Sequence, residues 1–259
     1  MKQVVRDRLK CHVYETRDEM GKQAALIAAQ QLKAVLAKQE EARVIFACAP
    51  SQNETLHYLT MEEGIDWSRV VGFHMDEYIG LSLNSDQWFN IYLQKHLLQK
   101  VQLKQFHFID GTVDPETMIE NYTKLLGEKP IDLVCLGIGE NGHIAFNDPP
   151  VADFDDPHLI KKVALDPFSR QQQVNDGCFA TLDEVPTHAL SLTIPALMRA
   201  KRMVCSVPGP TKAMAVRHTL FDPITVACPA TVMRRHEQAY LFVDKAAFVE
   251  ANRIFEAGE

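Results

Sequence analysis

The stretch that most constrains the fold runs from residue 131 to residue 150 and reads IDLVCLGIGENGHIAFNDPP. It begins with an almost continuous apolar run, which is typical of a short strand buried on both faces of a parallel sheet. Polar side chains follow at once, among them Asn141, His143 and Asp148. Ligands of open α/β sheets bind just beyond the carboxyl ends of the strands, so these residues predict a site. The competing interpretation of this stretch alone is a glycine-rich turn with a surface histidine.

Strands and helices alternate along most of the chain, which indicates an α/β domain with a mostly parallel sheet. A single domain over residues 1–259 is expected, because neither a linker nor an internal repeat interrupts the pattern. An edge strand or a hairpin is expected within residues 1–15, and the irregular region 148–187 is typical of a lid or pocket wall. Further strands are predicted at 44–49, 70–73, 106–109, 160–165, 203–207 and 239–243, and helices at 16–39, 86–98, 115–127 and around 56–61, 169–174 and 214–220.

The charge balance argues against nucleic-acid and membrane partners, because 27 Lys and Arg residues face 34 Asp and Glu residues, for a net charge of −7. A small anionic ligand is compatible with this charge, since a few local cations and helix N-termini suffice to bind it. Six cysteines without CxxC spacing predict free thiols, buried where they lie in apolar runs. The first residues form no apolar leader and no apolar run is long enough to span a bilayer, so a cytoplasmic protein is expected.

Four predicted strands end in polar clusters, and the carboxyl ends of parallel strands meet at one edge of the sheet. The clusters that begin with Ser51 and Thr211 also open helices, so they offer two positive helix ends and the Lys212 cation to an anion. The other two clusters supply carboxylates and a histidine. Together they predict a phosphorylated small molecule and acid–base chemistry. The four clusters are Ser51-Gln52-Asn53-Glu54, His74-Met75-Asp76-Glu77, Asn141-Gly142-His143 with Asp148, and Thr211-Lys212.

Each cluster also has a simpler interpretation. Ser51 followed by Glu54 is a helix capping box, Lys212 is typical of a solvated helix start, and an Asp-Glu pair is usually a surface feature. The histidine and carboxylates of the second cluster, joined by His143, could instead bind a metal, but zinc-ligand spacing such as HExxH is lacking. A serine nucleophile is disfavoured, because the chain has no GxSxG elbow.

Three motifs resemble the glucosamine-6-phosphate deaminase/isomerase family, which is related in fold to the 6-phosphogluconolactonases. They are FHMDEYIGL at 73–81, GIGENGHIAFNDP at 137–149 and PGPTKAMAV at 208–216. The resemblance implies a Rossmann-like fold, with helices on both faces of the mostly parallel sheet. It implies conversion of an amino-hexose 6-phosphate to a ketose 6-phosphate with release of ammonia, by a hydrolase/isomerase without metal or organic cofactor. The partner would be a phosphorylated amino sugar, and a homo-oligomer is compatible with the resemblance.

Matched position by position, the resemblance gives Asp76 the role of moving a proton between C2 and C1 of the sugar. It gives His143 the role of assisting ring opening, with Asn141 and Asp148 as partners where the family has an aspartate and a glutamate. The chemistry is coherent, because aldose–ketose exchange needs a base that moves a proton between neighbouring carbons. Ring opening needs a separate proton donor and acceptor, and imidazole titrates in the right range.

The same match gives Lys212 the role of contacting the phosphate. The loop after residue 50 departs from the glycine-rich, threonine-bearing phosphate loop of the family. The arginine with which the family holds phosphate has no clear match near Gly177, and Arg170 is the expected substitute, offset in register. The expected substrate- and phosphate-binding residues are therefore Ser51, Gln52, Asn53, Glu77, Lys212 and Arg170.

Three hypotheses about function follow. The first is a deaminase/isomerase for glucosamine 6-phosphate or its galactosamine epimer. The second is a lactonase of the 6-phosphogluconolactonase type, which shares the GxGxxGH element but does not need the proton shuttle at Asp76. The third is a non-catalytic sugar-phosphate sensor, for which the departures at Asn141, at Asp148 and in the phosphate loop are the only support. The MDEY motif at 75–78 favours the deaminase.

Overall fold

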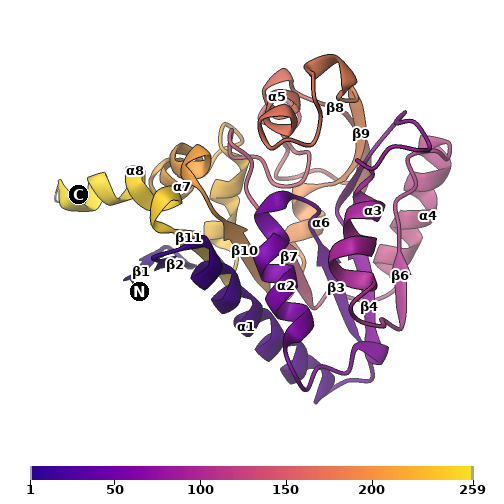
Figure 1. Ribbon diagram of the computed structural model, residues 1–259, viewed down its shortest axis with the longest axis horizontal. Helices are drawn as coiled ribbons and strands as arrows, with labels where there is room; N and C mark the ends of the chain where they lie inside the picture. Colours follow the sequence, from indigo (N-terminus) through magenta and orange to yellow (C-terminus); the bar gives the residue numbers. More distant parts are fainter. Residues whose placement is uncertain (1, 258–259) are drawn as a thin grey trace.

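An eight-stranded sheet forms the centre of the computed structural model, which describes residues 2–257 (Figure 1). The strands lie in the order β1-β2-β11-β10-β7-β3-β4-β6. All neighbours run parallel except β1 and β2, which form the predicted antiparallel hairpin. The strands are β1 (Lys2–Arg6), β2 (Leu9–Tyr14), β3 (Ala42–Phe46), β4 (Val70–His74), β6 (Gln105–His107), β7 (Leu133–Leu136), β10 (Met203–Val207) and β11 (Ala239–Asp244).

Helices cover both faces of this sheet, as predicted. Successive residues of a strand point to opposite faces, so Val44 and Phe46 pack in one apolar cluster and Ile45 packs in another. The first cluster includes α1 (Arg17–Leu36), α2 (Asn53–Met61) and α3 (Phe89–Leu93). The second includes α4 (Pro115–Gly127), α6 (Ile194–Met198), α7 (Ala213–Phe221) and α8 (Lys245–Glu256). Figure 1 shows α1 and α2 side by side in front of the sheet.

The predicted helix starts are fixed by side-chain caps. The Thr16 hydroxyl accepts the backbone N–H of Glu19 at 3.1 Å at the start of α1. The Asp114 carboxylate accepts the N–H of Thr117 at 3.0 Å, and Pro115 occupies the first position of α4. Both boundaries therefore follow from local sequence.

A second, three-stranded antiparallel sheet departs from the prediction. It has the order β5-β9-β8, formed by β5 (Asp76–Tyr78), β9 (His188–Leu192) and β8 (Ile160–Ala164). The acidic start of β5 gave no strand signal, because its pairing depends on β9 from a distant part of the chain. The helix predicted at 86–98 was wrong at its start, since α3 begins at Phe89 and continues as a π-helical turn over Gln94–Leu98. Figure 1 shows α5 (Pro167–Asn175), which follows β8 in the chain, above the main sheet.

The six cysteines carry free thiols, as predicted, and five of them are buried while Cys178 is partly exposed. Within residues 2–257, no helix has the length and apolar character needed to cross a membrane.

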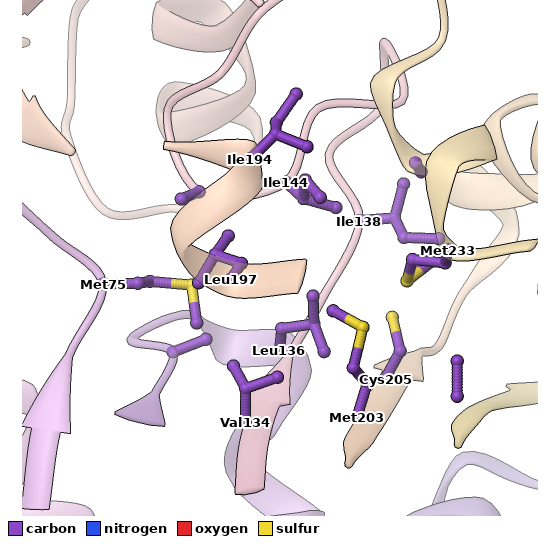
Figure 2. Packing of buried hydrophobic residues seen from close by; sticks show 14 of the residues in the cluster. Met75, Val134, Leu136, Ile138, Ile144, Ile194, Leu197, Met203, Cys205 and Met233 are labelled. Atoms are coloured by element: carbon purple, nitrogen blue, oxygen red, sulfur yellow. The ribbon is translucent and has the colours of Figure 1, made fainter. Parts of the chain in front are cut away.

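The loop after β7 is anchored by apolar side chains that reach back into the core (Figure 2). Ile138 and Ile144 are buried in the same cluster as Leu136 of β7 and Ile194 of α6. Met75, which follows β4, packs in this cluster as well. The polar residues between these anchors are therefore held at the carboxyl edge of the sheet instead of moving freely with a solvated loop.

Buried polar contacts join the start of α2 to β10. The Thr55 and Ser206 hydroxyls lie 2.8 Å apart, and the Gln52 amide donates to the Ser206 carbonyl at 3.2 Å. All three side chains are buried. These contacts fix the start of α2 relative to β10, the strand that leads into α7.

We expect Thr55→Val to lower the free energy of unfolding by about 1–3 kcal/mol, because it leaves the buried Ser206 hydroxyl without its partner at nearly unchanged shape. Denaturant unfolding measures the loss. Thr60→Val is the matched control on the same helix, since Thr60 is partly exposed and bonds only the His57 carbonyl. Equal losses in the two variants would contradict a structural role for the Thr55–Ser206 contact.

Candidate functional site

A cleft of about 260 Å³ lies at the carboxyl edge of the main sheet. Its walls come from the loops that follow β3, β4, β7 and β10, from α5, and from the first residue of α1. Asp76, His143, Ser51 and Lys212 all line it. The convergence of the four predicted clusters follows from the parallel pairing of their strands, which aligns the four carboxyl ends.

His143 is held by a compact set of hydrogen bonds on one side of its ring. Its Nδ1 lies 2.8 Å from Asn141 Oδ1, 3.0 Å from Asp148 Oδ1 and 2.9 Å from Ser169 Oγ. Because a carboxylate can only accept, these partners assign the Nδ1 proton and leave Nε2 as the nitrogen available to a molecule in the cleft. Although aspartate is shorter than the glutamate that the family has at this position, Asp148 reaches the imidazole ring.

The carboxylate of Asp148 is the shared acceptor of this relay. It accepts from the Asn141 amide at 2.8 Å and from the Ser169 hydroxyl, besides the His143 ring. Burial by itself would raise the pKa of Asp148, but these hydrogen bonds, with that of His143 foremost, hold it below its ordinary value. The lowered pKa keeps the Asp148 carboxyl group ionised, and its negative charge can stabilise an imidazolium at His143.

Two glycines permit this arrangement. A Cβ atom at Gly139 would lie 2.1 Å from the imidazole of His143, so a larger residue there would displace the ring. Gly142 has a φ of +84°, which residues with side chains rarely adopt, and a Cβ there would lie 2.5 Å from Cys228 Sγ. The GxGxxGH spacing thus serves close backbone approach around the histidine.

Asp76 lies where β4 passes into β5, and its side chain lines the cleft although only 7% of the residue is exposed. No hydrogen bond from residues 2–257 reaches its carboxyl group. Burial raises the pKa of Asp76 to about 8, because the apolar surroundings disfavour the charged form. A carboxyl group that exchanges its proton near neutral pH is suited to proton transfer.

Lys212 supplies positive charge on the other side of the cleft. Only 5% of the residue is exposed, and no carboxylate in the described part of the chain lies within ion-pair distance of its ammonium group. Burial lowers the pKa of Lys212, against the opposing effect of Asp176 and Glu140. The short 3₁₀ turns that contain Ser51 and Lys212 lead directly into α2 and α7, whose positive ends favour an anion beside them.

Four other predicted site residues have contacts outside the cleft lining. Glu77 accepts the backbone N–H groups of Tyr78, Phe89 and Asn90, so it caps the start of α3. The Asn53 side chain accepts the Tyr92 hydroxyl at 2.9 Å. Gln52 is buried and donates to Ser51 Oγ at 3.1 Å, so it positions a cleft residue.

Arg170, the expected substitute for the missing phosphate-binding arginine, is the fourth. Its guanidinium donates to the carbonyls of Leu182 and Val185, both at 2.7 Å from Nη2. It therefore ties α5 to the segment that follows and does not line the cleft.

His74 shows no metal-site geometry. It is fully buried, its Nε2 accepts the Ile109 N–H at 2.6 Å, and burial lowers its pKa to about 3. Across residues 2–257, no group of three His, Cys, Asp or Glu side chains is arranged to hold a metal ion.

Several cleft residues gave no sequence signal. Ser169 completes the relay from α5, and Gln172 and Asp176 extend the wall that this helix forms. Arg17, the first residue of α1, also lines the cleft. These residues belong to no motif, and only the packing of α1 and α5 around the sheet edge brings them to the site.

Comparisons with known proteins identify the family of this chain. The family model described as glucosamine-6-phosphate isomerases/6-phosphogluconolactonase matches residues 15–242. A glucosamine-6-phosphate deaminase of Lactobacillus delbrueckii subsp. bulgaricus is 32% identical over 240 residues, which cover 92% of this chain and 98% of the relative. Another, from Listeria monocytogenes, is 35% identical over 198 residues, which cover 76% of this chain and 82% of the relative.

Solved structures share the fold. A monomeric glucosamine-6-phosphate deaminase superposes with a TM-score of 0.83 at 26% identity, covering 93% of this chain and 99% of that one. A 6-phosphogluconolactonase of Thermotoga maritima superposes with a TM-score of 0.73 at 20% identity, covering 91% and 99%, which shows the common fold alone. The chain therefore belongs to the glucosamine-6-phosphate isomerase and 6-phosphogluconolactonase family.

Proposed function

We propose that this protein is an amino-hexose-6-phosphate deaminase/isomerase that converts glucosamine 6-phosphate, or its galactosamine epimer, to the ketose 6-phosphate with release of ammonia. One observation carries the proposal. A single cleft joins the buried Lys212, which has no ion-pair partner among residues 2–257, and two helix starts to the proton-transfer groups of Asp76 and His143. The names of the relatives support the same reaction. Since a phosphorylated sugar does not cross a membrane unaided, this substrate supports a cytoplasmic location for the enzyme.

Ring opening is the proposed task of His143. The closed sugar loses a proton from its C1 hydroxyl while its ring oxygen gains one. The free Nε2 of His143 can take the first proton and deliver the second, and the carboxylate of Asp148 stabilises the imidazolium formed between the two transfers. No metal or organic cofactor is required for these steps.

Isomerisation is the proposed task of Asp76. The carboxylate removes the proton from C2 of the open-chain sugar while the C1 carbonyl oxygen takes up a proton that the amino group at C2 releases, which gives an enolamine with a C1 hydroxyl. Asp76 then returns its proton to C1, which leaves an iminium at C2. Water adds to that carbon and ammonia leaves, giving the ketose. Before substrate binds, the raised pKa keeps much of Asp76 protonated at neutral pH. The ammonium group of an amino sugar would favour the charged carboxylate, so substrate binding itself would prepare the base.

The decisive test is ammonia release from glucosamine 6-phosphate and galactosamine 6-phosphate by the purified protein. Asp76→Asn should lower kcat by about 10²–10⁴-fold, because an amide cannot accept the proton. Asp155→Asn, an exposed aspartate outside the cleft, should match wild type.

Hydrolysis of 6-phosphogluconolactone is measured alongside. Lactone hydrolysis without ammonia release, unaffected by Asp76→Asn, would replace the proposal with a lactonase. Tight binding of the sugar phosphates with neither activity would indicate a sensor.

The raised pKa of Asp76 predicts a pH-dependent stability. The folded value of about 8 lies above the ordinary value of about 3.9 for aspartate, so between them the folded state binds a proton that the unfolded state lacks. This contribution is fully present below the unfolded pKa and is lost as the pH rises through the folded pKa.

Asp76→Asn should therefore gain free energy of unfolding relative to wild type between pH 4 and pH 8. We expect a gain of more than about 1.4 kcal/mol, the equivalent of one pKa unit. Denaturant unfolding at several pH values measures it, with Asp155→Asn as the control. A difference that is constant with pH would show that the Asp76 carboxyl has an ordinary pKa.

The assignment of phosphate predicts a separate effect at Lys212. Lys212→Met should raise KM for glucosamine 6-phosphate by about 10- to 100-fold, since a charge-assisted contact is worth ~1.5–3 kcal/mol. The value of kcat should change much less, because the ammonium does not touch the reacting carbons. Lys162→Met, which removes an exposed lysine of β8, is the control. An unchanged KM would place the phosphate elsewhere in the cleft.

A further inference from the structure

We propose that Arg17 is the second phosphate-binding cation of this cleft, in the role for which the sequence had indicated Arg170. The inference rests on the proposed function in taking the phosphate to be that of an amino-sugar substrate. It assigns a binding residue to the first turn of α1, a segment outside the three motifs of the family resemblance.

The start of α1 brings Arg17 to the cleft. The cap at Thr16 starts α1 at the carboxyl edge of the sheet, because the preceding strand β2 runs parallel to β11. Arg17 then lines the same cleft as Ser51 and Lys212. Its Nη2 donates to the carbonyl of Pro50, the residue directly before Ser51. The guanidinium therefore lies against the loop at which α2 begins.

The guanidinium of Arg17 is held from one side. Glu54, the second residue of α2, places Oε1 2.7 Å from Nε of Arg17, an ion pair without hydrogen-bond geometry. This ion pair and the hydrogen bond to the Pro50 carbonyl hold the guanidinium against the start of α2. Nη1 has no partner among residues 2–257, so its N–H groups remain available for an oxyanion. A planar guanidinium held in this way is suited to two parallel hydrogen bonds with phosphate.

The charges that line the cleft favour a second cation. Lys212 is a single cation and the carboxylate of Asp176 lines the same cleft, so a phosphate dianion there is better balanced by further positive charge. Arg17 lines the cleft, whereas its ion-pair partner Glu54 does not. Arg170 is not a source of charge there, since it does not line the cleft and its guanidinium donates to the carbonyls of Leu182 and Val185. In the lining of the cleft as described over residues 2–257, Arg17 and Lys212 are the two cationic side chains.

The test uses inorganic phosphate as the probe and titration calorimetry of the full chain as the readout. Arg17→Met should weaken phosphate binding by about 10- to 100-fold. Arg17→Lys should recover only part of the loss, because an ammonium keeps the charge but not the fork of donors. Lys22→Met is the matched control, since Lys22 is an exposed cation on the same helix outside the cleft.

Steady-state kinetics with glucosamine 6-phosphate separate binding from support of the loop. A phosphate contact raises KM by about the same factor in Arg17→Met and leaves kcat within about threefold of wild type. Loss of kcat with unchanged phosphate affinity would mean that Arg17 merely holds the Pro50 carbonyl, which overturns the proposal.

The remaining outcomes are also decisive. Equal phosphate affinity in Arg17→Met and Lys22→Met overturns the proposal, and so does a wild-type protein that binds no phosphate. If Arg17→Met loses phosphate binding while wild type releases no ammonia from either amino sugar, Arg17 stands as a phosphate ligand and the proposed reaction fails.

Discussion

The parallel pairing of β3, β4, β7 and β10 is the constraint on which the rest of the structure depends. Phe46 is paired with His74 and with Cys135, and Cys205 is paired with Leu136, so the four strands end at nearly one level. Each following loop must then leave the sheet at the same edge. An anion site and proton-transfer groups are brought together there from loops that are far apart in the sequence.

This assembly is costly for the folded state. Asp76 and Lys212 are both almost fully buried, and neither has an ion-pair partner in the described chain. Burial disfavours the charged form of each, as the raised pKa of Asp76 and the lowered pKa of Lys212 show. Groups of this kind persist where a ligand uses them, so the cleft trades stability for reactivity.

The sequence predicted the fold and the meeting of Asp76, His143 and Lys212 in one cleft, because both depend on local signals. Apolar runs and caps define the strands and helices, and polar clusters directly after strands mark Asp76, His143 and Lys212. The failures occur where long-range packing decides. Glu77 directly follows Asp76. Because successive side chains of a strand point to opposite faces, the Glu77 carboxylate contacts the start of α3. Arg17 lies far from every motif, and only the placement of α1 brings it to the cleft.

Helix α5 contributes both to the hydrogen bonds of His143 and to the wall of the cleft. Its Ser169 hydroxyl bonds the histidine relay, while Gln172 accepts the Glu140 N–H at 2.8 Å and forms part of the cleft wall. A substitution that loosens this helix therefore alters the shape presented to the sugar and the orientation of the imidazole together. We therefore expect substitutions in this one short helix to change affinity and turnover together.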